Sequence, residues 1–247
     1  MKNLRSYITA VLMLIASSTF AQTTTAVNHF DKVIVSPHVQ VTFVEGNEET
    51  VTIEKSTVDQ AKINIEVNHS TLRIYLDDAK EITKNRKTYE NGYQEKRSIY
   101  NGTVVTAIVT YKKLVALSIR GEETQVCKSL LKADNFKLKI YGTSKVYLNE
   151  VKLEKLQTTM YGESLLVIKA GSIQEQKYTV YGESEINSLG INGNAGKITA
   201  YGEADFKLNV SDEIHITAFG EAKLGYKGNP VISKGLNIGG TQISRIE

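Results

Sequence analysis

The sequence predicts an all-β protein, specifically a right-handed parallel β-helix (a β-solenoid) with about 20 residues per coil. Three observations lead to this fold class. A tetrapeptide recurs along the second half at a nearly constant interval, apolar and polar residues alternate around each copy, and the 247 residues include only two prolines and one cysteine. A period of two is the pattern of a half-buried strand, and a fixed period near 20 residues is typical of stacked coils.

Each copy of the repeat consists of an aromatic residue, a glycine, and then Glu-Ser or a close variant. The glycines are Gly142, Gly162, Gly182, Gly202 and Gly220, with a degenerate first copy at Gly121. Successive glycines are 21, 20, 20, 20 and 18 residues apart. A β-propeller blade needs about 40 to 50 residues, so the shorter period favours a solenoid of stacked coils. Parallel crossovers are almost always right-handed, and we expect the same hand here.

Every coil is expected to contain two strands joined at its glycine. Before Gly142, Leu138 and Ile140 alternate with polar or aromatic neighbours, and after it the alternation resumes at Val146. A glycine suits the bend because it accepts a positive φ and close backbone approach. We assign the regular repeats to residues 120–240.

The first half of the mature chain is predicted to continue this architecture without the tetrapeptide. Residues 77–100 are charged and weakly patterned, so we expect a long exposed loop or hairpin insert there. A basic binding arm is the sharper alternative, although acidic residues interleave with the basic ones. The tail, residues 236–247, is expected to cap the open end. Strands are expected at 33–35, 39–44, 50–54, 63–67, 72–76, 103–109 and 114–119.

Residues 1–21 have the pattern of a secretory signal peptide: two basic residues, an apolar stretch, and small residues before the cleavage site. Residues 22–247 are then a single exported β-solenoid domain, in the periplasm, at the outer-membrane surface or outside the cell. No later apolar run reaches the ~18 residues of a membrane helix. Removing Lys2 and Arg5 leaves 28 basic and 27 acidic residues, a net charge of +1. This charge favours no nucleic-acid partner.

Two rows of candidate site residues follow from the repeat. Equivalent residues of stacked coils should lie about 4.7–4.9 Å apart on the outer surface. The rows form either a ladder that shields the backbone beside a solvated acidic face, or a ligand platform. On a platform, rings would stack on a sugar or peptide, and carboxylates would receive hydroxyls, amines or Ca²⁺; no other cofactor is expected. The aromatic row is Tyr141, Tyr161, Tyr181, Tyr201 and Phe219, and the carboxylate row is Glu163, Glu183, Glu203 and Glu221.

No catalytic site or metal site is predicted. The four histidines are scattered without metal-ligand spacing, and Cys127 has no histidine-partnered context. Asp77 and Asp78 form the acidic pair of the kind that a β-helix polysaccharide lyase would use for Ca²⁺, but they lie at a loop edge.

Several segments resemble a single family. They are His29–Val35, Val39–Val44 with Gly46, Leu72–Ile74, Leu114–Gly121, and the stacked Gly-Glu-Ser copies. Together they are similar to an exported domain of unknown function in Bacteroidota, called the putative auto-transporter adhesin, head GIN domain, from about Phe30 to the C-terminus. The resemblance implies a parallel β-helix-like fold and a cell-envelope location. The chain differs from the usual family pattern in its charged insert and its regular Tyr-Gly-Glu row.

We therefore expect a non-catalytic secreted or cell-envelope binding module, adhesin-like, that recognises a glycan or a protein through its outer strand faces. A carbohydrate-active β-helix enzyme of the polysaccharide-lyase kind is one alternative. A passive structural or self-associating envelope protein is the other.

Overall fold

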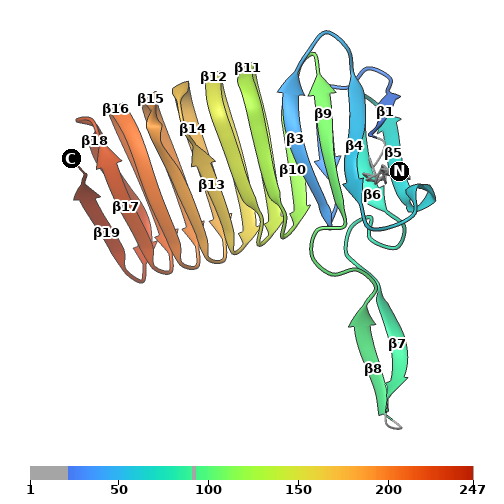
Figure 1. Ribbon diagram of the computed structural model, residues 1–247. Helices are drawn as coiled ribbons and strands as arrows, with labels where there is room; N and C mark the ends of the chain where they lie inside the picture. The colour runs from blue at the N-terminus through green and yellow to red at the C-terminus, as the bar shows by residue number, and fades with distance from the viewer. Residues whose placement is uncertain (1–21, 91–92, 247) are drawn as a thin grey trace, which may run out of the picture.

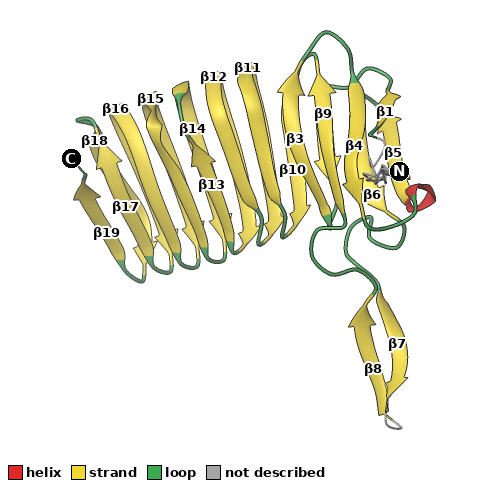
Figure 2. Ribbon diagram, viewed as in Figure 1, coloured by secondary structure: helices red, strands yellow, loops and turns green. Residues whose placement is uncertain are grey.

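The computed structural model describes residues 22–90 and 93–246; the predicted signal peptide, residues 1–21, lies outside the described residues. The chain winds into a β-solenoid whose coils stack side by side (Figure 1). Tyr161 pairs in register with Tyr181, and Tyr181 with Tyr201, so these coils have 20 residues each. The all-β solenoid predicted from the sequence is therefore confirmed. Most described residues are in strands, with a short 3₁₀ turn, η1 (Gln60–Lys62), near one end (Figure 2).

The regular coils present two faces, each built from parallel strand segments. Each long strand passes from one face to the other. Its N-terminal half therefore belongs to one face and its C-terminal half to the other. The tyrosine face, as we call it, contains β10 (Ala116–Gly121), β14 (Gly171–Tyr181), β18 (Val231–Ile238), and the C-terminal halves of β11 (Thr124–Gly142), β12 (Lys145–Gly162), β15 (Ser184–Tyr201) and β16 (Ala204–Phe219). The opposite face contains the N-terminal halves of those four strands with β13 (Ser164–Ile168), β17 (Ala222–Lys227) and β19 (Thr241–Arg245).

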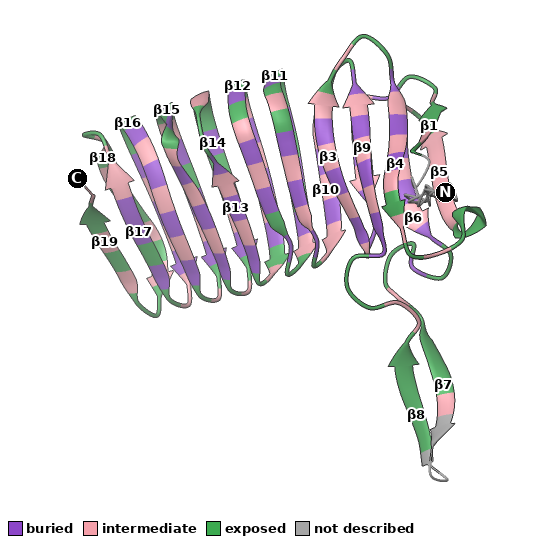
Figure 3. Cartoon of the chain, in the orientation of Figure 1, coloured by how far each residue is buried: buried purple, intermediate pink, exposed green. Residues whose placement is uncertain are grey.

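The interior between the two faces is filled by apolar side chains. Buried and less buried residues alternate along each strand (Figure 3), as the period of two predicts. Phe136, Phe206 and Tyr178 are among the largest fully buried side chains. Burying a side chain such as Phe stabilises the fold by roughly 1.5–3 kcal/mol. Cys127 is a buried free thiol whose pKa is raised by burial, so its unreactive thiol form is favoured.

The N-terminal part follows the predicted coil architecture in some of its strands and departs from it in others. Two of its strands, β2 (Lys32–Val35) and β3 (Val39–Glu45), do pair in parallel with β10 and β11 of the repeats. Strands β6 (Thr71–Leu76) and β9 (Val105–Tyr111) in turn pair in parallel with β2 and β3, so they form one further coil. Antiparallel pairing begins at the outer edge of that coil. In antiparallel pairs lie β1 (Thr23–Ala26) with β4 (Thr50–Ser56), β4 with β9, and β5 (Ile63–Asn68) with β6.

The reversal has a local cause in the turn between β5 and β6. His69 and Ser70 form a two-residue connection, and both have positive φ, 47° and 57°. Positive φ at both central residues is the geometry of a type I′ turn, which returns the chain antiparallel at once. β5 therefore runs back along β6 instead of forming a coil of its own, and the antiparallel strands β4 and β5 close this end of the solenoid.

The other end of the solenoid also differs from the prediction. The tail was expected to cap the open end, but β18 and β19 continue the two faces as a last coil, each paired in parallel with the coil before it. The capping devices are side chains. Lys234 pairs in register with buried Ile216, and Arg245 with Tyr226. Charges at inward positions of an edge coil discourage a further strand from adding.

Between β6 and β9, the strands β7 (Asn85–Glu90) and β8 (Tyr93–Ser98) form a separate two-stranded antiparallel sheet that projects from the solenoid (Figure 1). In the described part of the chain, no helix has the length and hydropathy to span a membrane.

Candidate functional site

The bend of each coil positions the side chains of the tyrosine face. Gly162 has a φ of 104°, and a Cβ atom there would lie 2.4 Å from the carbonyl oxygen of Gly142 in the preceding coil. Only glycine fits such a close approach of two backbones. Two residues later, the Ser164 hydroxyl donates a hydrogen bond to the same carbonyl, at 2.9 Å. Glycine and serine together hold successive bends in one column.

This column places the aromatic row in a continuous stack, the aromatic ladder. Adjacent ring planes lie within 2–5° of parallel, and adjacent centroids are 4.8–5.0 Å apart. At one end, the Arg120 guanidinium lies 4.9 Å from the centroid of the Tyr141 ring. The central rings are half-buried, about 40% exposed. The ladder comprises Tyr141, Tyr161, Tyr181, Tyr201 and Phe219.

Each central ring is covered on both sides by its neighbours. The ladder therefore presents ring edges and hydroxyl groups to solvent rather than open ring faces. The interpretation that each ring stacks flat on a sugar does not fit this geometry. A phenol edge can instead donate and accept hydrogen bonds through its hydroxyl and contact apolar atoms through its ring carbons.

Two more columns run beside the ladder, and sequence reasoning missed both. Two residues before the aromatic position lies a threonine column, Thr159, Thr179, Thr199 and Thr217. Four residues before it lies a column that is mostly basic, Lys137, Gln157, Lys177, Lys197 and His215. The signal was present as Lys-x-Thr-x-Tyr, which occurs at 177–181 and again at 197–201.

The predicted carboxylate row lies at the bends, beyond the tyrosines. All four carboxylates are exposed, and adjacent ones at strand spacing repel by roughly 0.9 kcal/mol in water. Three of them line a hollow of about 230 Å³ together with Lys223. Within residues 22–90 and 93–246, no group of three His, Cys, Asp or Glu side chains is placed to hold a metal ion. The row is Glu163, Glu183, Glu203 and Glu221.

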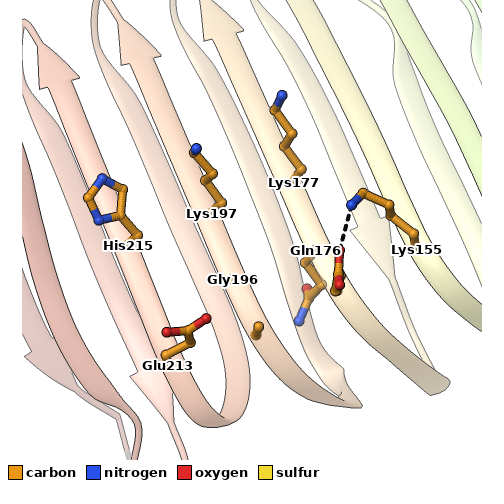
Figure 4. A pocket seen from close by; sticks show the side chains of 9 residues that line it. Lys155, Gln176, Lys177, Gly196, Lys197, Glu213 and His215 are labelled. Carbon is orange, nitrogen blue, oxygen red and sulfur yellow. Dashed lines mark hydrogen bonds and ion pairs between the residues drawn. The ribbon is translucent and has the colours of Figure 1, made fainter.

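A second hollow, of about 400 Å³, opens on the tyrosine face beside the basic column (Figure 4). It lies where the coil of β15 carries Ala195 and Gly196, so long side chains are missing from its floor. Lys177, Lys197 and His215 line one side of it. We call this feature the Gly196 hollow.

Both charged and buried polar groups border the Gly196 hollow. Lys155 forms an ion pair with Glu175, Nζ to Oε2 at 2.5 Å. Gln176 is buried, and its Oε1 accepts hydrogen bonds from the hydroxyls of Tyr178 and Ser188, both at 2.9 Å. Its Nε2 has no acceptor among the described residues.

At the N-terminal end of the ladder, a polar cluster borders a hollow of about 570 Å³. The Glu81 carboxylate pairs with both Arg73 and Arg120, and its pKa is lowered; partial burial alone would raise the pKa, but the two guanidinium groups outweigh it. His38 uses both ring nitrogens, Nδ1 at 2.7 Å from the Gly102 carbonyl and Nε2 at 2.6 Å from the Thr83 hydroxyl.

One buried carboxylate belongs to this cluster. Glu123 accepts a hydrogen bond from the Glu122 backbone N–H at 3.0 Å, and its Oε1 lies 3.9 Å from His38 Nδ1. Burial raises the pKa of Glu123 despite these contacts, which act in the other direction. The acidic pair considered for a lyase lies apart from it, exposed, with Asp77 bonded to Asn64 and Asp78 to Lys84.

Comparison with known proteins finds similarity over most of the chain. A family model described as "Putative auto-transporter adhesin, head GIN domain" matches residues 29–230, and no curated protein matches the chain. Similar solved structures include a putative adhesin from Bacteroides fragilis NCTC 9343, with a TM-score of 0.76 and 20% identity, covering 91% of this chain and 96% of that one. At this identity the likeness shows the fold alone.

Two further structures support the same fold. A putative adhesin from Parabacteroides merdae ATCC 43184 has a TM-score of 0.60 and 17% identity. A putative lipid binding protein from Parabacteroides distasonis ATCC 8503 has a TM-score of 0.65 and 16% identity. Both alignments cover 92% of this chain and 96% of the other.

Proposed function

The chain belongs to the putative auto-transporter adhesin, head GIN domain family, and from this premise we propose that it is a non-catalytic, adhesin-like binding module. It acts in the cell envelope or outside the cell, and it recognises an extended glycan or polypeptide through the tyrosine face. The observation that carries this proposal is the repetition of one surface. Coil after coil presents the same threonine and aromatic positions in register.

A repeated surface suits a repeated ligand. Each coil offers a threonine hydroxyl, and the ladder offers ring edges whose centroids are 4.8–5.0 Å apart. Single hydrogen bonds at an exposed site are weak, about 0.5–1.5 kcal/mol. Several equivalent contacts to one long ligand add up, because the later ones form at high effective concentration.

The experiment measures binding of the protein to a panel of polysaccharides and envelope fractions. The triple variant Tyr161→Ser, Tyr181→Ser, Tyr201→Ser removes the central ladder, and the variant with Phe at the same positions removes only the hydroxyls. The ladder already contains a Phe, at 219, so the second variant should keep the stack. Tyr147→Ser is the control on the opposite face, where Tyr147 lies at an outward position between buried Val146 and Leu148.

The proposal expects the serine triple to lose binding while the opposite-face control keeps it. Melting temperatures separate recognition from scaffolding: the phenylalanine triple should keep its melting temperature, so any binding that it loses belongs to the hydroxyls. If no panel member binds the wild type, or if the serine triple binds as tightly as the wild type, the proposal is wrong. Release of new reducing ends during the assay would instead indicate a carbohydrate-active enzyme.

A further inference from the structure

The central part of the tyrosine face carries an uneven distribution of charge. Its three in-register columns, the basic column, the threonine column and the aromatic ladder with Arg120, contain no carboxylate among the described residues. Four lysines lie there, and none has a carboxylate within ion-pair distance among the residues that the structure describes. They are Lys137, Lys139, Lys177 and Lys197.

Carboxylates are displaced to both sides of this strip. On one side, the neighbouring column contains Glu175 and Glu213; on the other, the carboxylate row follows the bends. Lys177 and Lys197 are paired directly in register, and like charges in that position destabilise a sheet. Alternating lysines and carboxylates within the strip would have avoided this repulsion. Their separation into different columns therefore points to a negative charge supplied by a ligand.

The Gly196 hollow adds a place for that counter-charge. Lys177, Lys197 and His215 border it on one side, and Glu213 lines it as well. Because the Lys155 ammonium is already paired with Glu175, Lys177 and Lys197 are the ammonium groups left to meet an anion. The buried Gln176 amide takes no part, because its Nε2 lies inside the coil beside Gly193.

We infer that this strip binds a linear acidic polysaccharide, with its chain along the solenoid axis and its carboxylates on Lys177 and Lys197. The inference rests on the proposed function and names its ligand class. A polyuronate carries one carboxylate on every sugar, so its charges repeat at intervals comparable with the coil spacing. The sugar hydroxyls would meet the threonine and tyrosine hydroxyls of the adjacent columns.

The test uses polygalacturonate and its carboxyl-reduced counterpart, which keeps the backbone and lacks the charge. The variant Lys177→Gln with Lys197→Gln should weaken binding of polygalacturonate about tenfold, since each exposed charge pair accounts for a factor of about two to five. Replacing the same two lysines by arginine should preserve binding. The control, Lys145→Gln with Lys223→Gln, makes the same change in net charge on the opposite face, at exposed residues.

Wild-type affinity for polygalacturonate should also fall as salt rises from about 0.1 M to 1 M, because the Debye length shrinks from about 10 Å to 3 Å. Equal binding of the carboxyl-reduced polymer, or equal losses in the two double glutamine variants, would overturn the inference. If the protein binds a neutral glycan or a protein through its tyrosines and ignores polygalacturonate, the proposed function stands and this inference fails. If nothing on the panel binds, both fail.

Discussion

The regular coils and the N-terminal end hold their bends in place by different contacts. In the regular coils, every bend meets a nearly identical bend. One glycine per coil holds the column, and at Ser144, Ser164 and Ser184 a serine hydroxyl also donates to a glycine carbonyl of the preceding coil. At the N-terminal end, the bend of the β2–β3 coil carries a polar cluster in place of the glycine repeat, and antiparallel strands cover the outermost coil. A repeat thus depends on its neighbours for stability, and its ends need their own solutions.

The same contrast separates two kinds of surface. The repeats generate a flat face with uniform columns, suited to a long ligand. The N-terminal end generates a local, non-repeated cluster of titratable groups, Glu81, Glu123 and His38 among them. Variants chosen in pairs, one from each region, test whether this division is real.

The largest difference is expected at the glycines. Gly162→Ala places a Cβ 2.4 Å from a backbone carbonyl at a φ of 104°, whereas at Gly102 (φ 57°) nothing lies within 4 Å of an added Cβ. Gly162→Ala should destabilise the protein by about 3 kcal/mol or more, and Gly102→Ala by about 1–2 kcal/mol. Urea unfolding of both variants checks this. Equal losses would contradict the glycine column.

The aromatic ladder should give the next largest effect. Tyr181→Ser removes two ring pairs, each contributing about 0.5–1.5 kcal/mol beyond its burial, so a loss of about 1–3 kcal/mol is expected. Tyr181→Phe should cost little, since the stack remains. Calorimetric melting of the two variants gives the comparison, and equal destabilisation by both would mean that the hydroxyl, not the stack, supports the fold.

The serine column should have a smaller effect. Ser164→Ala removes a hydrogen bond to the Gly142 carbonyl and should cost about 1 kcal/mol. The equivalent positions of later coils are already alanine, at Ala204 and Ala222. Placing serine at Ala204 is the reciprocal control and should be neutral or slightly stabilising. A gain in melting temperature on Ser164→Ala would contradict the role given to this hydroxyl.

The smallest effect is expected at the N-terminal cluster, and it depends on pH. Burial raises the pKa of Glu123 in the folded protein, so the folded state holds this proton more tightly than the unfolded state. The stabilising contribution is present at low pH and is lost as pH rises through the folded pKa. Glu123→Gln, which stays neutral, should therefore melt slightly higher than wild type at pH 7 and equally near pH 4.

The exposed neighbour Glu122 is the control for this experiment, since Glu122→Gln changes the net charge by the same amount without changing a buried group. A lower melting temperature of Glu123→Gln at pH 7 would show that the carboxylate's contacts with His38 and the Glu122 N–H outweigh its burial.

The regular half of this fold could be predicted because short sequence patterns specify it. A glycine about every 20 residues identifies the coil, and the alternation of apolar and polar residues identifies the side chains that point outward. The orientation of the rings could not be predicted, because alternation places Tyr161 on a face without specifying its side-chain torsions. The basic column was visible in the Lys-x-Thr-x-Tyr spacing of 177–181, but it becomes a column only through register with Lys197.

The N-terminal end was less predictable for a physical reason. Its reversal depends on His69 and Ser70 adopting positive φ, which these residue types signal poorly compared with Asn-Gly. Its polar cluster joins His38 to Glu123, which lie 85 positions apart in the sequence and meet only after the coil has closed. Long-range register, rather than local pattern, creates that site.

The central claim, that the tyrosine face is the binding surface, is tested most directly by lysine footprinting. Lysines on both faces are acetylated with and without the tightest-binding polysaccharide of the panel, and the modified sites are quantified by mass spectrometry. The account predicts protection of Lys137, Lys177 and Lys197 with unchanged labelling of Lys145 and Lys223 on the opposite face. Protection of the opposite face, or equal protection of both, would contradict it.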